Sequence, residues 1–238
     1  MTYPSSVEAG QSKVASISHN RSLILKICLL FGLMLIIMLL NVSSKAQAQE
    51  VPQLTGQLPA LTGPQKRTLS LIAREAIDAT IESRPSREAM VDPRLMVPQA
   101  MVVSIYIDGR LRARAWRLTE LQPLYLAARD LTYLALSTPK VGSTKINQEE
   151  LLRARVSLAV LSNFTLAKDE TEIPPRTAVV IYSGFTEWLG LPGDVASGGA
   201  KDLLTYVCSQ AGLRPMAWLL PRTTIYSAEV EGTTESDF

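Results

Sequence analysis

The sequence predicts an α+β fold with a largely antiparallel, twisted sheet flanked by helices, preceded by an N-terminal hydrophobic targeting or anchor helix. Three observations support this prediction. Residues 101–118 have the pattern of a β-hairpin, residues 66–83 and 123–136 have helical apolar spacing, and the strands and helices show no regular βαβ alternation. The composition, with 47% hydrophobic and 19% charged residues, excludes a disordered chain, a coiled coil and a disulfide scaffold.

The hairpin is the clearest local signal in the chain. Residues 101–107 are apolar and β-branched, and residues 111–118 alternate again. Asp108 and Gly109 between them are residue types that adopt the positive φ angles of a tight two-residue turn. The sequence therefore predicts two adjacent antiparallel strands joined at this dipeptide.

The N-terminal segment determines the predicted compartment. Residues 27–40 are an uninterrupted apolar run of 14 residues, which suits a signal peptide and falls short of the roughly 20 residues of a spanning helix. An Ala-Gln-Ala tripeptide at 46–48 has the form of a signal-peptidase site. Cleavage after Ala48 predicts a periplasmic or secreted protein, and an uncleaved anchor over 23–41 predicts a membrane-tethered one. Both place the rest of the chain outside the cytoplasm; a buried core helix is the remaining alternative.

The rest of the chain divides by composition. The predicted segments are a leader or anchor at 1–48, a Pro- and Gly-containing linker at 49–66, one folded domain at 67–231 and a polar tail at 232–238. Within the folded domain, further strands are predicted at 156–161, 178–182 and 225–230, and a helix at 200–211 with Gly212 directly after it.

The residue inventory excludes several classes of enzyme. The single histidine, His19, precedes the apolar run, so the exported part has no Ser-His-Asp or Cys-His machinery and no His-based zinc site. Cys208 is the one thiol that follows Ala48, and its apolar surroundings favour a buried structural role over a reactive thiol or an interchain disulfide. No catalytic residue, metal site or cofactor is predicted.

The net charge of +2 belongs to the leader. Four of the 24 Lys and Arg residues, but only one of the 22 Asp and Glu residues, lie in residues 1–48. The exported part is close to neutral, so no nucleic acid is predicted as a partner.

An arginine-rich stretch in the second hairpin strand is the candidate ligand site. In a regular strand, Arg110, Arg112, Arg114 and Trp116 share one face. The functional interpretation is a site for a small anionic ligand, with Trp116 available for a cation–π contact. The structural interpretation is a solvated outer face whose charges pair with local acids such as Glu120 and Asp130. If that face is exposed, replacing Arg112 and Arg114 together by alanine leaves the fold intact.

The order of these motifs resembles the AMMECR domain family, whose bacterial members include the AmmeMemoRadiSam system protein A. The resemblance covers about residues 68–230 and rests on segments 71–77, 103–112, 121–125, 156–162, 189–196 and 208–213. It implies an α+β fold with a twisted antiparallel sheet, and the family has no established activity. The family signature L-R-G-C-I-G is replaced at 111–116 by L-R-A-R-A-W, which keeps Arg112 but places Arg114 where the family has cysteine.

Three functional hypotheses follow. The first is a non-catalytic binding or scaffold module, exported or membrane-tethered through its N-terminal segment, with an envelope protein as a partner. The second is an enzyme or enzyme-accessory protein related to the AmmeMemoRadiSam system, with an anion-binding pocket near Arg112. The altered signature and the absence of histidine favour the first; a purely structural protein without a ligand is the third alternative.

Overall fold

The protein is described here by a computed structural model, which covers residues 59–87, 90–119, 121–138, 145–184, 186–196 and 199–234. Within these ranges no helix combines the length and the apolar character needed to cross a bilayer. The predicted leader or anchor, 1–48 with its hydrophobic part at 23–41, lies outside the described residues.

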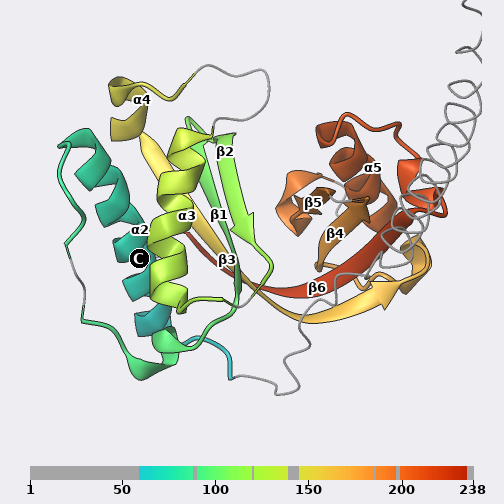
Figure 1. Cartoon of the computed structure of the whole chain (residues 1–238), viewed down its shortest axis with the longest axis horizontal. Helices are drawn as coiled ribbons and strands as arrows, with labels where there is room; N and C mark the ends of the chain where they lie inside the picture. Colours follow the sequence, from blue (N-terminus) through green and yellow to red (C-terminus); the bar gives the residue numbers. More distant parts are fainter. Residues whose placement is uncertain are drawn as a thin grey trace, which may run out of the picture. The chain divides into compact units, whose positions relative to one another are not determined.

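A single antiparallel sheet of six strands forms the framework, in the order β2-β1-β3-β6-β4-β5 (Figure 1). The strands are β1 (Ala100–Ile107), β2 (Arg110–Arg117), β3 (Ala154–Ala167), β4 (Ala178–Ser183), β5 (Thr186–Gly190) and β6 (Thr223–Thr234). The prediction of an α+β fold with a largely antiparallel sheet is confirmed.

Two groups of helices cover the sheet. The helices are α2 (Gly63–Ile81), α3 (Leu124–Ser137), α4 (Gln148–Leu152) and α5 (Ala200–Gln210), and the 3₁₀ turns are η1 (Pro93–Met96), η2 (Glu170–Glu172), η3 (Pro192–Asp194) and η4 (Ala217–Leu219). Figure 1 shows α2 and α3 side by side over β1 to β3, with α5 beside β4 and β5.

The core has three parts because the sheet is curled. One cluster packs α2, α3 and α4 on the sheet through residues such as Leu69, Leu131 and Ile105. A second packs α5 on β4 and β6 through Leu204 and Ile181. The third contains side chains from the strands and their flanking loops and from no helix, and it takes residues from all six strands. Side chains alternate between the two faces of a strand, so this third cluster fills the face opposite the helices.

The hairpin is confirmed. β1 and β2 pair directly, and the turn residues Asp108 and Gly109 both have positive φ, at 52° and 77°. The helix predicted at 200–211 is also confirmed as α5, and Gly212 follows it with φ 68°, where its N–H bonds the carbonyl of Ser209 at 3.1 Å.

Several elements extend beyond their predicted limits. Helix α2 begins at Gly63, inside the predicted linker, because Pro64 suits a first helical turn and Gln65 accepts the Thr62 N–H at 2.9 Å. Strand β6 runs to Thr234, into the predicted polar tail. Its polar end is held because Glu231 accepts the Leu61 N–H at 2.8 Å and pairs with Lys66 at 3.0 Å.

Strand β5 lies in a glycine-flanked segment that the sequence analysis did not assign to a strand. Its last residue, Gly190, lies directly under α5. A Cβ atom at this position would come within 2.5 Å of Val207 and 2.8 Å of Leu203. Here glycine permits close packing of a helix on an edge strand.

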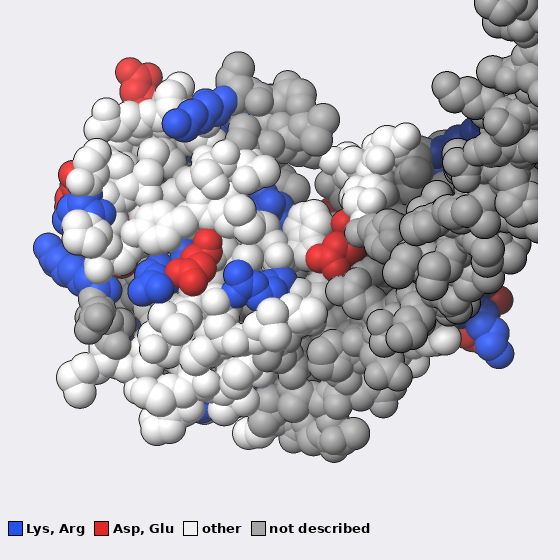
Figure 2. Space-filling model, in the orientation of Figure 1, with Lys and Arg blue, Asp and Glu red and all other residues white. Residues whose placement is uncertain are grey.

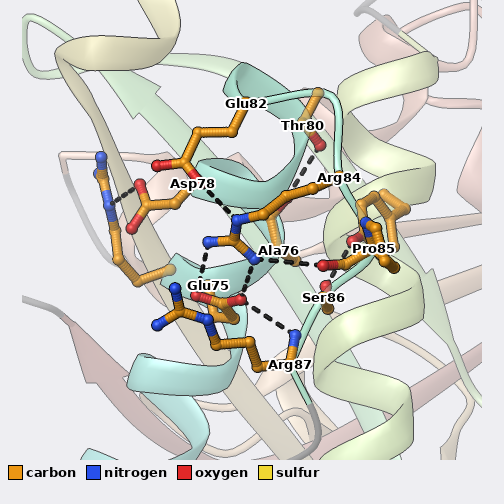
Figure 3. A network of polar contacts seen from close by, with 11 residues as sticks. Glu75, Ala76, Asp78, Thr80, Glu82, Arg84, Pro85, Ser86 and Arg87 are labelled. Atoms are coloured by element: carbon orange, nitrogen blue, oxygen red, sulfur yellow. Dashed lines mark hydrogen bonds and ion pairs between the residues drawn. The ribbon is translucent and has the colours of Figure 1, made fainter.

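A network of charged side chains stabilises the C-terminal end of α2 (Figure 3). The Arg84 guanidinium bonds Glu75 and Glu82, and Glu75 also accepts the Arg87 backbone N–H at 3.0 Å. The hydrogen bond from Arg84, followed by that from Arg87, lowers the pKa of Glu75 from 4.5 to about 2. The ionised form of the Glu75 carboxyl is therefore more favourable in the folded state than in the unfolded state.

This network predicts a pH dependence of stability. Because the Glu75 pKa is lower in the folded state, its contribution is complete above about pH 4.5 and is lost as pH falls toward 2. We expect Glu75→Gln to reduce the fall in Tm across this window, measured by thermal denaturation. Glu82→Gln, which removes the other carboxylate on Arg84, is the matched control and should leave the fall in place. Equal acid sensitivity of wild type and Glu75→Gln would contradict the assignment.

Candidate functional site

A buried ion pair joins the strand of the predicted ligand site to the far end of the sheet. Arg114 of β2 binds Asp194 of η3 through two hydrogen bonds, Nη1 to Oδ2 at 2.6 Å and Nη2 to Oδ1 at 2.7 Å. The two side chains are only 8% and 4% exposed. Arg114 Nε also donates to the Ser104 hydroxyl at 2.8 Å, and Ser104 is itself buried. The guanidinium thus has a fixed partner on each of its three nitrogens.

The same pair connects the two edges of the sheet. Asp194 Oδ2 accepts the Leu191 N–H at 2.8 Å, so the carboxylate also holds the turn that follows β5. Farther along β2, Trp116 Nε1 donates to Glu187 of β5 at 3.1 Å. β2 and β5 are the first and last strands in the sheet order. Side chains therefore bridge two edge strands that share no strand pairing with each other, and they hold the sheet in its curled form.

The electrostatics at this pair favour the charged forms. Burial lowers the pKa of Arg114, but the hydrogen bond and the charge of Asp194 outweigh burial, and the net pKa is raised. Burial, assisted by the Asp194 charge, raises the pKa of the neighbouring Tyr206 hydroxyl, which therefore stays neutral. A permanently charged, fully bonded guanidinium cannot act as a general acid or base, so the pair is suited to a structural role.

Arg112 has a different partner, on α4. Its Nε lies 3.2 Å from Glu150 Oε1, and both side chains are about one-fifth exposed. The Asn147 N–H and then Arg112 lower the pKa of the Glu150 carboxyl. A register shift between Ile105 and Tyr106 places Arg112 in β2 as the one extra residue between Leu111 and Ala113.

The register shift also changes the position of Arg110. This residue pairs with Ile107, whose side chain belongs to the helix-side core, whereas Arg114 and Trp116 lie opposite Ser104 and Val102. Residues directly opposite in a ladder share a face. The prediction of one continuous face from Arg110 to Trp116 is therefore wrong, because the bulge interrupts the two-residue alternation.

Of the two acidic partners named from the sequence, Asp130 is not a partner of the arginines of β2, and Glu120 is not tested. Asp130 pairs with its neighbour Arg129 at 2.9 Å, and Glu120 lies outside the described residues. The observed partners, Glu150, Glu187 and Asp194, are 38 to 80 positions from the residues that they bind. The double alanine substitution at Arg112 and Arg114 was expected to be tolerated if this face is exposed; because Arg114 is buried and paired, we expect it to destabilise the fold.

A pocket near the β1–β2 turn contains the basic side chains that the sequence analysis missed. It has a volume of about 860 Å³, and its walls include Arg74, Tyr106, Asp108, Leu152, Arg153 and Arg155. We call it the hairpin-end pocket. Arg112 is not among its lining residues. A sequence signal was present, since Arg153 and Arg155 flank the first residue of β3, but neither matches a known motif.

The three arginines of the hairpin-end pocket differ in how firmly they are held. Arg74 binds Asp78 at 3.0 Å and the carbonyl of Ala154 at 2.8 Å. Arg153 binds Asp108 at 2.7 Å, and both are more than half exposed. Arg155 is exposed, and no hydrogen bond or ion pair is found for its side chain within the part of the chain that the structure describes. The walls therefore hold more guanidinium than carboxylate groups.

The face of the protein drawn in Figure 2 shows no large patch of charge of one sign. On the face drawn in Figure 2, the coloured basic and acidic side chains lie in small groups of both signs. Within the described ranges, no three His, Cys, Asp or Glu residues gather in a way that could hold a metal ion. Cys208 is fully buried, and burial raises the pKa of its thiol, which agrees with the structural role expected for it.

Comparison with known proteins supports the fold and leaves the function open. The sequence matches no family model and no curated protein. The structure is similar to the crystal structure of an uncharacterized protein from Pyrococcus horikoshii, with a TM-score of 0.61 and 20% sequence identity. The alignment covers 74% of this chain and 93% of that one. At this level of identity the similarity establishes a shared fold.

The buried pair makes a strong prediction about stability. Asp194→Ala leaves the Arg114 charge buried without its partner, so we expect a loss of about 3–5 kcal/mol in the free energy of unfolding. Arg129→Ala, which breaks the more exposed pair with Asp130, should cost about 1 kcal/mol or less. Urea denaturation measures both.

The double variant Arg114→Met with Asp194→Leu separates charge burial from lost packing. Because it removes both charges, it should be less destabilised than the sum of the two single variants. An Asp194→Ala protein as stable as Arg129→Ala would show that the pair does not hold the sheet.

Proposed function

We propose that this protein is a non-catalytic binding module outside the cytoplasm that takes a small anionic group, a phosphate or a carboxylate, in the hairpin-end pocket. The observation that supports it is the charge of the pocket walls, where Arg74, Arg153 and Arg155 outnumber the single carboxylate of Asp108. Guanidinium groups match the planar oxygens of carboxylates and phosphates with paired N–H donors.

Arg155 is the residue best placed to bind such a group. It lies directly opposite Tyr106 across β1 and β3, so the guanidinium and the phenol share one face of the sheet. Arg153 can contribute a second guanidinium by exchanging its exposed bond with Asp108 for one to the ligand. Arg74, held by Asp78 and the Ala154 carbonyl, adds a positive charge at a fixed position.

The side-chain inventory favours binding over catalysis. The described part of the chain contains no histidine, its one cysteine is buried with a raised pKa, and Arg114 is committed to Asp194. The hairpin-end pocket therefore offers a better anion site than the β2 face on which Arg114 is committed to Asp194. The alternative of an enzyme or enzyme-accessory protein of the AmmeMemoRadiSam system rests on the sequence resemblance, and no contact among the described residues favours it.

The AMMECR-like assignment and the extracytoplasmic location are parts of the same proposal. The curled antiparallel sheet flanked by helices agrees with the fold that the family resemblance implies. The apolar run at 27–40 supports either cleavage after Ala48 or a membrane anchor. A domain held at that surface could also recruit an envelope protein, which a pulldown from solubilised membranes would recover.

Anion binding can be tested by thermal shift and titration calorimetry on the full chain in detergent. Inorganic phosphate should raise Tm above an ionic-strength-matched chloride control, because a ligand that binds only the folded state stabilises it. We expect Arg155→Gln to remove most of this shift. Arg129→Gln, on α3 and outside the pocket, is the matched control and should retain it. Equal shifts in the two variants would refute the assignment of the pocket.

The location can be tested by fractionating cells that express the chain with a C-terminal tag. We expect the tagged protein in the membrane or in an extracytoplasmic fraction, and mass spectrometry should show either an N-terminus at Gln49 or the intact chain. An intact, freely soluble chain in the cytosol would contradict both the leader and the anchor hypotheses.

A further inference from the structure

The segment between α5 and β6 exposes apolar side chains at its tip. Met216, Leu219 and Leu220 are 46%, 55% and 58% exposed, and they lie within five consecutive positions around η4. Other large exposed apolar residues, such as Leu71 on α2 and Leu152 on α4, stand farther apart along the sequence. Isolated exposed leucines are ordinary, whereas a cluster on one tip indicates a contact surface.

The base of this segment is firmly held, so the tip cannot fold inward. Ala217 and Trp218 are 5% and 3% exposed and pack in the α5-side core. The Thr223 hydroxyl donates to the Ala217 carbonyl at 3.0 Å, and the Leu220 N–H donates to the same carbonyl at 3.1 Å. These contacts fix the backbone on which Leu219 and Leu220 are exposed.

Charges on either side of the tip select its partner. Arg214 and Arg222 are exposed at the two ends of the segment, and no Asp or Glu occurs between Asp202 and Glu229. Apolar side chains between two arginines complement a surface that is apolar inside and anionic outside.

We infer that residues 214–222 form a membrane-contact turn, which inserts Met216, Leu219 and Leu220 into the interface of an anionic phospholipid bilayer. Arg214 and Arg222 then lie at the level of the lipid phosphates. A bilayer fits better than a protein because three apolar side chains cover far less than the roughly 800 Å² that each partner buries in a stable protein interface. Apolar groups at an interface need only reach about 5–10 Å into the headgroup boundary.

This contact is independent of the hairpin-end pocket and of the fate of the leader. With an intact anchor, the turn is a second attachment point that orients the folded domain on the membrane. After cleavage, it is a weak peripheral contact by itself, because membrane binding of this kind increases with buried apolar area and with the number of basic side chains.

A fluorescent probe at residue 219 reports whether the membrane-contact turn enters the bilayer, even when the leader also attaches the chain to the vesicles. The full chain with Cys28→Ser and Leu219→Cys can be labelled at residue 219 with a fluorophore sensitive to polarity, since Cys208 is fully buried. The matched control carries the label at Leu134→Cys on α3, which replaces a side chain of similar exposure that does not line the hairpin-end pocket. Thermal denaturation of each labelled protein confirms that it is folded.

With vesicles of phosphatidylglycerol and phosphatidylcholine, we expect a blue shift of the residue 219 probe and its quenching by a lipid-borne quencher, with neither change at residue 134. The double variant Arg214→Gln with Arg222→Gln should need roughly fivefold more lipid, or more, to reach half of the blue shift. Vesicles of phosphatidylcholine alone should have the same effect on the unchanged turn. A residue 219 probe that stays in water on anionic vesicles would overturn the inference. So would a blue shift that appears without lipid as protein concentration rises, because it would indicate self-association.

Discussion

The buried ion pair between Arg114 and Asp194 is the interaction on which the curled sheet depends. An isolated charge in this position would be strongly destabilising, because desolvation is not compensated unless partners satisfy the charge. Arg114 obtains those partners only when the turn after β5 lies against β2, the opposite edge of the sheet. A flat sheet would separate the two residues. The pair thus couples the electrostatic stability of one side chain to the curvature of the whole domain.

Side-chain contacts also link the two edge strands of the sheet. β2 and β5 each have one side without a strand partner, and such edges are sites of unwanted pairing between molecules. The Arg114–Asp194 and Trp116–Glu187 contacts link these two edges through their side chains. Arg114 and Trp116 close the sheet, and their side chains are not free to meet a ligand.

The surfaces left for binding lie at opposite ends of β3. The hairpin-end pocket includes Ala154, the first residue of the strand, and the membrane-contact turn precedes Ile225, which pairs with the last residue, Ala167. Strand β3 has 14 residues, so its ends are separated by roughly 45 Å when fully extended, and by less across its bend. A domain held to a lipid surface at one end would present the pocket at the other. The apolar faces between these ends are covered by α2, α3 and α5.

Local chemistry in the sequence determined the hairpin at Asp108 and Gly109, the amphipathic helices and the glycine that ends α5, because each depends on residues within a few positions of one another. The α+β class followed from the order of those elements. The partners of Arg112 and Arg114 depended on tertiary structure, since Asp194 is 80 positions from Arg114. The bulge in β2, which removes Arg110 from the face of Arg114, likewise comes from how two strands pair and has no composition signal of its own. Alternation along a strand indicates which residues can share a face, but only the folded chain decides which charges meet and which remain available to a ligand.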